Sequence, residues 1–324
     1  MHHPLAIIIP AYNEEAAIGK TVADYKAHFP DAVFVVVDNN SSDNTFDVAR
    51  AALDPDKDHL IKEFRQGKGY AVKSGLSRVD AQIYLMTDGD LTYPAEEAKR
   101  LYERMLAERP DVLVGDRASS GAYSAQNNRL GHSFGNKVLT GIISKFSGQK
   151  FNDVLSGLRV MSRQYVASLD VRSEGFQLET EMNIVAAYLR AHVVEEPINY
   201  VQRGEDSESK LNTIRDGIRI LNFAFFNWVA FYPMKILSRI ALVLLIASVA
   251  LMVRVYIGFA STGFEEMIYP STAALAFVLL SLAVFTLYVG VMLRIIGRNA
   301  RRRDVAAFLD QRRRWNGALD AFTS

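Results

Sequence analysis

The stretch Ile83-Tyr-Leu-Met-Thr-Asp-Gly-Asp-Leu91 decides the fold class of this chain. Its apolar run ends abruptly in Asp88-Gly-Asp90, which predicts a buried strand that stops at a polar edge of a sheet. In an open parallel sheet, ligands bind just beyond the carboxyl ends of the strands. Two carboxylates so close together repel each other unless a cation lies between them, and Mg²⁺ or Mn²⁺ suits such hard oxygen ligands. We therefore predict a metal site at Asp88 and Asp90, with a solvated Asp-Gly turn as the alternative.

Strands and helices are predicted to alternate on both sides of this stretch. Short apolar runs at residues 5–9, 32–37, 60–64 and 112–115 predict further strands, and helical spacing fills the segments between them. Such alternation is typical of an α/β fold in which helices flank a mostly parallel sheet. Polar clusters follow the strands, so we expect these clusters to gather at one edge of the sheet.

The later part of this region is less regular. An amphipathic helix is predicted over residues 128–146, and further helices open near residues 163 and 175. A last strand is predicted over residues 193–200. The polar segment 203–211 is expected to be mobile and to close as a lid over a bound ligand.

The composition narrows the class of protein. The chain has 324 residues, which favours more than one structural unit, and a net charge of +1, which gives no argument for a nucleic-acid partner. It has no cysteine, which excludes disulfides and thiolate metal sites. The N-terminal apolar run is short and precedes a proline, so we expect no secretory signal peptide. Arginines crowd the C-terminal end: Arg298, Arg301, Arg302, Arg303, Arg312, Arg313 and Arg314.

Two apolar stretches near the C-terminus are long enough to cross a bilayer, since a helical span needs about 20 residues. They cover residues 236–259 and 271–296, and the aromatic-rich segment 214–231 suits the bilayer interface. The connector between them carries Glu265 and Glu266 but no lysine or arginine, whereas both outer flanks are basic. By the positive-inside rule, we expect both flanks in the cytoplasm. Two buried helices of a soluble protein are the alternative.

A series of short motifs, in a fixed order and followed by two spans, resembles one protein family. The motifs are Pro10-Ala-Tyr-Asn-Glu14, Val37-Asp-Asn-Asn-Ser-Ser-Asp-Asn-Thr45, Gly67-Lys-Gly69, Asp88-Gly-Asp90, Gly115-Asp-Arg117, Asp153 with Ser156-Gly157, and Arg203 with Ser209-Lys210. The chain resembles the family-two glycosyltransferases with a GT-A fold. Within that family it is similar to the polyprenyl-phosphate glycosyltransferases, such as the dolichol-phosphate mannosyltransferases and the undecaprenyl-phosphate glucosyltransferases.

The resemblance implies a GT-A (Rossmann-like), mostly parallel sheet with flanking helices, followed by interfacial helices and two C-terminal transmembrane helices. Four segments follow from it: a cytoplasmic catalytic domain at 1–211, an interfacial amphipathic region at 212–235, two transmembrane helices within 236–296 and a basic cytoplasmic tail at 297–324. The protein would be a multi-pass protein of the cytoplasmic (inner) membrane, with the catalytic domain and both termini in the cytoplasm.

The resemblance also implies roles for individual residues. Mg²⁺ or Mn²⁺ would be bound by Asp88 and Asp90. The nucleotide-sugar donor would be bound by Pro10, Tyr12, Asn13, Glu14, Asp38, Asn39, Lys68, Gly69, Asp88 and Gly89. The phosphate of the lipid or the diphosphate of the donor would be bound by Arg117, Arg129, Ser133, Arg203, Ser209 and Lys210.

The predicted catalytic carboxylates are Asp90 and Asp153. Asp153 would act as a base or would orient the attacking phosphate, with a helix cap or an arginine partner as the alternative. Glu179 and Glu181 are weaker candidates, because a solvated face explains them equally well. The chain departs from the family pattern twice. The family often has a second Asp where this chain has Asn39, and a Gln where it has Thr92, so the third metal contact and the base stay open.

The predicted activity is inverting, metal-dependent transfer of one hexose from a UDP- or GDP-sugar to polyprenyl (undecaprenyl or dolichyl) phosphate. The predicted partners are the nucleotide-sugar, the lipid acceptor, the bilayer and, in a homo-oligomer, further copies of the chain, but no nucleic acid. Three alternatives remain open: a membrane glycosyltransferase with another lipid-linked or protein acceptor, a non-catalytic membrane scaffold of the same fold, and a cation channel or transporter. The last is disfavoured because the spans carry no ionisable residue near their centres.

Overall fold

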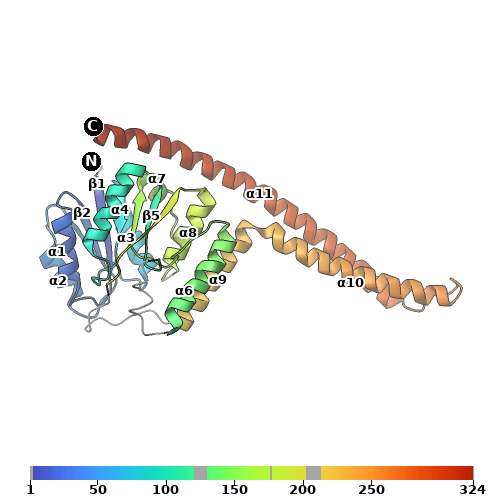
Figure 1. Cartoon of the computed structure of the whole chain (residues 1–324). Coiled ribbons are helices and arrows are strands. Elements are labelled where there is room, and N and C mark those ends of the chain that lie inside the picture. Colours follow the sequence, from blue (N-terminus) through green and yellow to red (C-terminus); the bar gives the residue numbers. More distant parts are fainter. Residues whose placement is uncertain (1–2, 120–129, 176, 202–212, 324) are drawn as a thin grey trace. The chain divides into compact units, whose positions relative to one another are not determined.

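The computed structural model describes residues 3–119, 130–175, 177–201 and 213–323 (Figure 1). The chain divides into two compact units. The first comprises Met1–Ala224 together with Asp304–Ser324, and the second comprises Phe225–Arg303. The chain therefore leaves the first unit once and returns to it near its C-terminal end.

A seven-stranded sheet in the order β3-β2-β1-β4-β6-β5-β7 forms the centre of the first unit. Its strands are β1 (His3–Ala11), β2 (Val33–Asp38), β3 (His59–Lys62), β4 (Ala81–Met86), β5 (Val112–Asp116), β6 (Arg159–Ser162) and β7 (Val193–Pro197). The described helices of this unit are α1 (Ile18–His28), α2 (Thr45–Ala52), α3 (Lys68–Arg78), α4 (Ala95–Glu108), α6 (Leu130–Ser147), α7 (Arg163–Ala167), α8 (Leu178–Leu189), most of α9 (Thr213–Phe231) and the C-terminal part of α11 (Pro270–Thr323).

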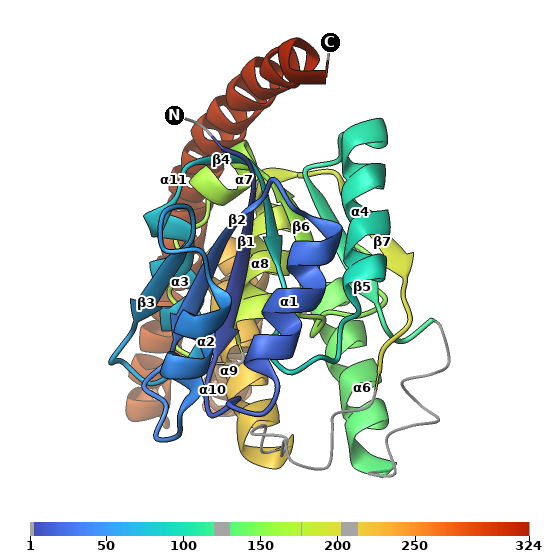
Figure 2. The same cartoon turned by 90° about the vertical axis from the view of Figure 1, so that its left-hand side faces the viewer.

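The central strands β1, β2 and β4 are mostly apolar, as expected for a sheet that is covered on both faces. Along β1, Ile7 and Ile9 face one core, which includes Ile18 of α1 and Leu101 of α4. Ile8 faces the opposite core, which includes residues of α3 and α8. Helices α1 and α4 lie in front of the sheet in Figure 2. This is the predicted α/β architecture with helices on both faces.

One strand of the sheet was not predicted. β6 pairs antiparallel with β4 on one side and with β5 on the other, whereas the other strand pairs are parallel. β6 has only four residues, and its first residue is a fully buried arginine, Arg159. Such a short segment with a charged residue shows no strand periodicity, so the sequence could not reveal it.

The end of β1 also differs from the prediction. The predicted strand ends at residue 9, but Pro10 also lies within β1 and is in register with Val37 of β2. The pairing of β1 with β4 ends at Ile8, so Pro10 has a neighbouring strand on the β2 side alone. The missing N–H of proline therefore breaks no ladder hydrogen bond on the β4 side.

The C-terminal part of α11 (Pro270–Thr323) belongs to the first unit, whereas the sequence predicted a basic tail there. Phe308 lies in one core of the sheet and Trp315 in the other. The indole Nε1 of Trp315 donates to the backbone oxygen of Gln82 at 2.8 Å. Arg312 lies 3.4 Å from the buried Asp111. Gln82 and Asp111 lie at the amino-terminal ends of β4 and β5, so this helix covers the edge opposite to the predicted site.

The second unit contains α10 (Pro233–Ser261) and the first part of α11. The hydroxyl of Ser248 donates to the backbone oxygen of Ala276 at 2.7 Å, which joins the two helices. Both helices are long and apolar enough to cross a membrane. Large apolar side chains such as Ile246 and Phe285 are exposed on them, unlike those of helices in a soluble core. The two helices contain the predicted spans 236–259 and 271–296.

Candidate active site

The polar segments after β1, β2 and β4 meet at the carboxyl edge of the sheet, as predicted. The backbone N–H of Asn13 donates to Ser41 Oγ at 3.0 Å, and that of Glu14 donates to Thr45 Oγ1 at 2.8 Å. Asn13 has a positive φ of 51°, which asparagine tolerates better than most residues. A Cβ built on Gly89 would lie 3.5 Å from the backbone oxygen of Pro10. The loop after β1 is therefore hydrogen-bonded to the segment after β2, and the end of β1 lies close to Gly89.

Asp38, at the end of β2, is a buried carboxylate whose two oxygens differ in their hydrogen bonding. The side chain is fully buried, and its Oδ1 accepts a hydrogen bond from the backbone N–H of Ser41 at 3.3 Å. Among the described residues, no donor reaches the buried Oδ2. A buried acceptor without a donor costs about 1–3 kcal/mol, so a ligand N–H at this position would be favoured.

Asn39 uses its side-chain amide to fix the segment before α3. Its Nδ2 donates to the backbone oxygens of Glu63 at 3.3 Å and Arg65 at 2.7 Å. Its Oδ1 accepts a hydrogen bond from the backbone N–H of Gly67 at 2.7 Å. An ionised aspartate cannot donate, so only an amide satisfies all three bonds. This explains why the chain departs from the family pattern here.

The glycines around Lys68 accommodate a close approach of the protein's own backbone. A Cβ built on Gly67 would lie 2.1 Å from the backbone oxygen of Glu174, and one on Gly69 would lie 1.9 Å from that of Ser173. The N–H of Gly69 donates to the Glu174 oxygen at 3.0 Å. Gly67 and Gly69 therefore let the first turn of α3 lie directly against the segment that precedes α8, and the predicted contact of Gly69 with the donor stays a prediction.

Lys68, in the first turn of α3, bridges two carboxylates. Its Nζ lies 2.6 Å from Asp88 Oδ1 and 2.6 Å from Glu179 Oε1. Burial disfavours the charged ammonium, but the two carboxylates outweigh this effect and hold the pKa of Lys68 above its usual value. Lys68 is therefore a cation next to the Asp-Gly-Asp motif. Glu179, a weak candidate from sequence, lies at this site and not on a solvated face.

Asp90 is buried, and its carboxylate is hydrogen-bonded by Thr92. Its Oδ1 accepts hydrogen bonds from the N–H of Thr92 at 3.1 Å and from Thr92 Oγ1 at 2.6 Å. Threonine thus orients this carboxylate where the family often has glutamine. A polar side chain that orients a metal ligand in this way is typical of metal sites.

The carboxylate oxygens of Asp88 and Asp90 are ligand atoms that fit a hard divalent cation. Among the described residues there is no cluster of three or more histidine, cysteine, aspartate or glutamate side chains arranged to hold a metal. Mg²⁺ is commonly held by one or two carboxylates together with the phosphates of a substrate. A Cβ on Gly157 would lie 2.8 Å from Asp88 Oδ2, so a glycine there leaves this carboxylate its space.

Asp153 forms an ion pair with Arg117, which is the arginine-partner alternative of the sequence analysis. Arg117 Nε lies 2.7 Å from Oδ2 and Nη2 lies 3.0 Å from Oδ1, while Asn136 Nδ2 donates to Oδ1 at 3.1 Å. Burial raises the pKa of the Asp153 carboxyl, but Arg117 and the hydrogen bonds bring it below its usual value. Because Asp153 is fully buried and saturated with donors, its geometry does not fit a base that accepts a proton from substrate.

Two residues that the sequence analysis missed support the loop containing Ser156 and Gly157. The buried guanidinium of Arg159 donates to the backbone oxygen of Ser156 at 3.0 Å and to Asn183 Oδ1 at 2.9 Å. The hydroxyl of Tyr93 accepts a hydrogen bond from the N–H of Gly157 at 2.9 Å. No periodic pattern marks a buried arginine inside a short strand. Tyr93 follows Asp90 by three residues, so its closeness to the Asp-Gly-Asp motif could have identified it from sequence.

Several predicted site residues cannot be placed. Arg129, Arg203, Ser209 and Lys210 lie outside the described residues, as does the predicted lid at 203–211. Ser133 lies in α6, but its side chain is not described. Tyr12 is half-buried in the loop after β1, and Glu14 is buried there.

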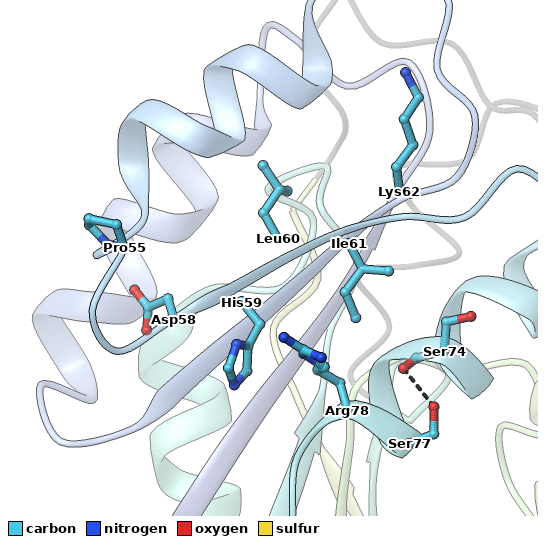
Figure 3. Close-up of a pocket in the computed structure, with 9 residues that line it drawn as sticks. All are labelled: Pro55, Asp58, His59, Leu60, Ile61, Lys62, Ser74, Ser77 and Arg78. Carbon is cyan, nitrogen blue, oxygen red and sulfur yellow. Dashed lines mark hydrogen bonds between the residues drawn. The ribbon is translucent and has the colours of Figure 1, made fainter.

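A pocket elsewhere on the first unit is unrelated to these residues. It runs between β3 and α3 and is lined by Pro55, Asp58, His59, Leu60, Ile61, Lys62, Ser74, Ser77 and Arg78 (Figure 3). None of the predicted site residues that the structure describes lines it. Its carboxylate, Asp58, pairs with Lys26 at 2.7 Å and accepts a hydrogen bond from the N–H of Phe34, so the charge is already compensated.

The mixed sheet, the joined loops after β1 and β2, and the acidic motif after β4 define a glycosyltransferase of the GT-A fold. The chain belongs to glycosyl transferase family 2, whose sequence model matches residues 6–169. The family, the fold class and the enzyme class predicted from sequence are therefore confirmed.

Individual proteins are similar to this chain. Glycosyltransferase AglJ of Haloferax volcanii is 32% identical over 216 residues, which cover 66% of this chain and 68% of AglJ. The dolichyl-phosphate hexose transferase of the same organism is 30% identical over 217 residues, which cover 67% and 90% of the two chains. Glucosyl-3-phosphoglycerate synthase of Mycobacterium tuberculosis, solved with Mn²⁺, UDP and glucosyl-3-phosphoglycerate, matches in fold with a TM-score of 0.53, 19% identity and coverage of 68% and 80%.

Proposed function

We propose that this protein is an inverting hexosyltransferase that moves one hexose from a UDP- or GDP-linked donor to a polyprenyl phosphate. The observation that carries the proposal is the acidic pair Asp88 and Asp90 beside the cation Lys68, at the carboxyl edge of a family-two sheet. The chain also has two helices long and apolar enough to cross a bilayer. A relative named dolichyl-phosphate hexose transferase supports this class of acceptor.

The nucleoside would bind between the loops after β1 and β2. The buried Oδ2 of Asp38 requires a hydrogen-bond donor, and a ring N–H of the base would supply one. Uracil and guanine both carry such an N–H, whereas the corresponding ring nitrogen of cytosine is an acceptor. A uracil or guanine base therefore fits this acceptor, in agreement with a UDP- or GDP-sugar as donor. Asn39 would act indirectly, by holding the backbone of residues 63–67 beside the base.

The diphosphate would lie at Asp88 and Asp90, which would hold Mg²⁺ or Mn²⁺. When bound, this cation supplies Lewis-acid stabilisation of the charge that grows on the leaving diphosphate. Lys68 adds a positive charge from the protein, and the oriented carboxylate of Asp90 fixes the position of the donor. Preorganised charges of this kind stabilise a transition state without reorganisation of solvent.

The acceptor phosphate needs positioning more than it needs a base. The second pKa of a phosphate monoester is about 6, so the group is largely ionised near neutral pH. One of its oxygens forms a bond to C1 of the hexose while the bond from C1 to the diphosphate breaks and the electron pair leaves with the diphosphate. Arg117 is the described cation best suited to orient the attacking phosphate, because Asp153 holds its guanidinium in place. Attack opposite the leaving group inverts the configuration at C1.

The membrane helices would anchor the enzyme and bring the lipid phosphate to the site. The basic flanks of the two spans favour a cytoplasmic catalytic unit at the inner membrane, with both termini in the cytoplasm. Nucleotide-sugars are available in that compartment. A homo-oligomer would give the two spans of each chain additional packing partners.

The test is a transfer assay with purified full-length protein in detergent, a panel of radiolabelled UDP- and GDP-sugars, and undecaprenyl or dolichyl phosphate as the sole acceptor. We expect a lipid-linked hexose from one donor, and loss of that product on adding EDTA or in Asp90→Asn. Transfer only to a lipid-linked oligosaccharide or a protein would contradict polyprenyl phosphate as the acceptor. Full turnover in the presence of EDTA would contradict the proposed role of a divalent metal.

A further inference from the structure

The ammonium group of Lys68 contacts a carboxylate that a divalent cation at the Asp-Gly-Asp motif would also bind. Its Nζ contacts Asp88 Oδ1 and Glu179 Oε1, both at 2.6 Å, and its side chain and that of Glu179 are 15% and 4% exposed. Asp88 is one of the two carboxylates of the metal site inferred above. The protein's own ammonium therefore already neutralises a ligand that the metal would need.

The backbone of Lys68 is fixed, so only its side chain can change position. The residues on either side, Gly67 and Gly69, pack against the backbone oxygens of Glu174 and Ser173 so closely that a Cβ would not fit. The N–H of Gly69 donates to the Glu174 oxygen at 3.0 Å. This contact ties the first turn of α3 to the segment that leads into α8, which carries Glu179. The Lys68–Glu179 pair is thereby built into the fold, whereas Asp88 comes from a separate loop after β4.

We propose that Lys68 is a resident cation of the Asp-Gly-Asp site that competes with the divalent metal for Asp88 until a nucleoside diphosphate arrives. The inference rests on the proposed function, because it takes the nucleoside diphosphate of the donor as the ligand. Asp88, Asp90, Glu179 and Lys68 together carry three negative charges and one positive charge. A divalent cation at Asp88 would face the ammonium, and like charges at contact distance repel each other.

The diphosphate resolves this competition. The oxygens of the diphosphate accept hydrogen bonds from the ammonium group of Lys68. The ammonium keeps its contact with Glu179 but leaves Asp88, so the carboxylate of Asp88 can bind the metal. No covalent bond is made or broken in this exchange. Each ligand then strengthens the binding of the other, since such coupling is reciprocal at equilibrium. The consequence is that the enzyme binds metal weakly alone and strongly with the donor.

The test measures Mn²⁺ binding to purified full-length protein by electron paramagnetic resonance, with and without UDP or GDP. The wild type is compared with Lys68→Met and with Lys73→Met. Lys73 lies on the same helix, is 53% exposed and pairs with Asp170, so it controls for loss of a charge outside the site. We expect Lys68→Met to bind Mn²⁺ alone about tenfold more tightly than the wild type, and to gain less from the nucleotide. Lys73→Met should match the wild type.

A second pair of variants covers the case in which Lys68→Met does not fold, because it leaves the buried Glu179 without its cation. Glu179→Gln is compared with the double variant Lys68→Met, Glu179→Gln, so that the pair differs only in the lysine. Tighter Mn²⁺ binding by the double variant supports the proposal. Equal or weaker binding overturns it, even if the wild type binds Mn²⁺ with nucleotide. Absence of Mn²⁺ binding in every variant, with or without nucleotide, overturns the metal role itself as well.

Discussion

Arg117 and Asp153 form a buried bidentate ion pair, with Nε 2.7 Å from Oδ2 and Nη2 3.0 Å from Oδ1. The pair joins the end of β5 to the loop that precedes β6. One member comes from a motif that the family resemblance assigns to phosphate binding, and the other from a motif that it assigns to catalysis. In this geometry the two act together, because the aspartate fixes the cation.

Replacing Asp153 by asparagine should remove transfer and weaken the fold. The change leaves Arg117 buried without its counter-charge, which costs about 3–5 kcal/mol. We expect transfer activity to fall by about 100-fold or more, and the midpoint of urea unfolding to fall with it. Arg117→Lys, which keeps the charge but loses the two-bond geometry, should lower activity with a smaller loss of stability. Near-normal transfer by Asp153→Asn would contradict the orienting role.

The Asp153 ion pair should also give stability a specific dependence on pH. The pKa of Asp153 is lower in the folded protein than its usual value of about 4. Its contribution is therefore full above about pH 5 and is lost as the pH falls through the lowered pKa. Wild type should lose more unfolding free energy than Asp153→Asn between about pH 5 and pH 3. Parallel losses in the two proteins, measured by urea unfolding at each pH, would show that the ion pair is not responsible.

Asn39→Asp should be more harmful than its small change in size suggests. The new carboxylate would face the backbone oxygens of Glu63 and Arg65, which the amide now satisfies. We expect a loss of about 1–3 kcal/mol in unfolding free energy and a higher KM for the donor, with a smaller change in kcat. Asn39→Ala removes the same bonds without adding charge, so it should be the milder variant. Calorimetric titration with UDP and GDP would reveal the change in donor affinity directly.

Gly157→Ala tests whether Asp88 needs its present position. The added Cβ would lie 2.8 Å from Asp88 Oδ2, so the carboxylate or the loop must shift. We expect at least about tenfold weaker Mn²⁺ binding in the presence of nucleotide, since metal affinity depends on such positioning. The matched control is Gly141→Ala in α6, where the added Cβ meets nothing within 4 Å. If both variants bind Mn²⁺ as the wild type does, Asp88 is not a ligand at this place.

Trp315→Ala should destabilise the first unit, although the residue lies in a segment that the sequence assigned to a basic tail. Trp315 is 4% exposed and donates to Gln82 from the far end of the chain. Loss of a buried tryptophan costs about 3–5 kcal/mol. Arg313→Ala, at an exposed position of the same helix, should leave the thermal midpoint unchanged. A midpoint for Trp315→Ala equal to that of Arg313→Ala would show that the helix does not support the fold.

The sequence predicted the parts of the structure that follow from repeating patterns. The strand from residue 81 to 86, the acidic pair after it and the two apolar helices all carry strong local signals. It failed where the signal is not local. The glycines around Lys68 resemble a ligand-binding turn, yet they are needed because residues 173 and 174 pass close to them. Such a contact joins positions about 100 residues apart, and no pattern within a short window records it.

The same limit applies to individual side chains. Glu179 has the sequence context of a surface residue, and only the fold brings its carboxylate to Lys68. Arg159 is a charged residue inside the sheet. Its guanidinium can be buried there because it donates hydrogen bonds to Ser156 and Asn183. Trp315 follows a run of arginines that masks its apolar role. In each case the decisive partner lies elsewhere in the chain.

The discontinuity of the first unit has a practical consequence for work with a water-soluble fragment. A fragment that stops at residue 224 omits the apolar helices, but it also omits Phe308, Trp315 and Leu319, which fill both cores of the sheet. Such a truncation would expose apolar surface and favour aggregation. A fragment that joins residue 224 to residue 304 through a flexible linker would keep those side chains while it omits the apolar helices of the second unit.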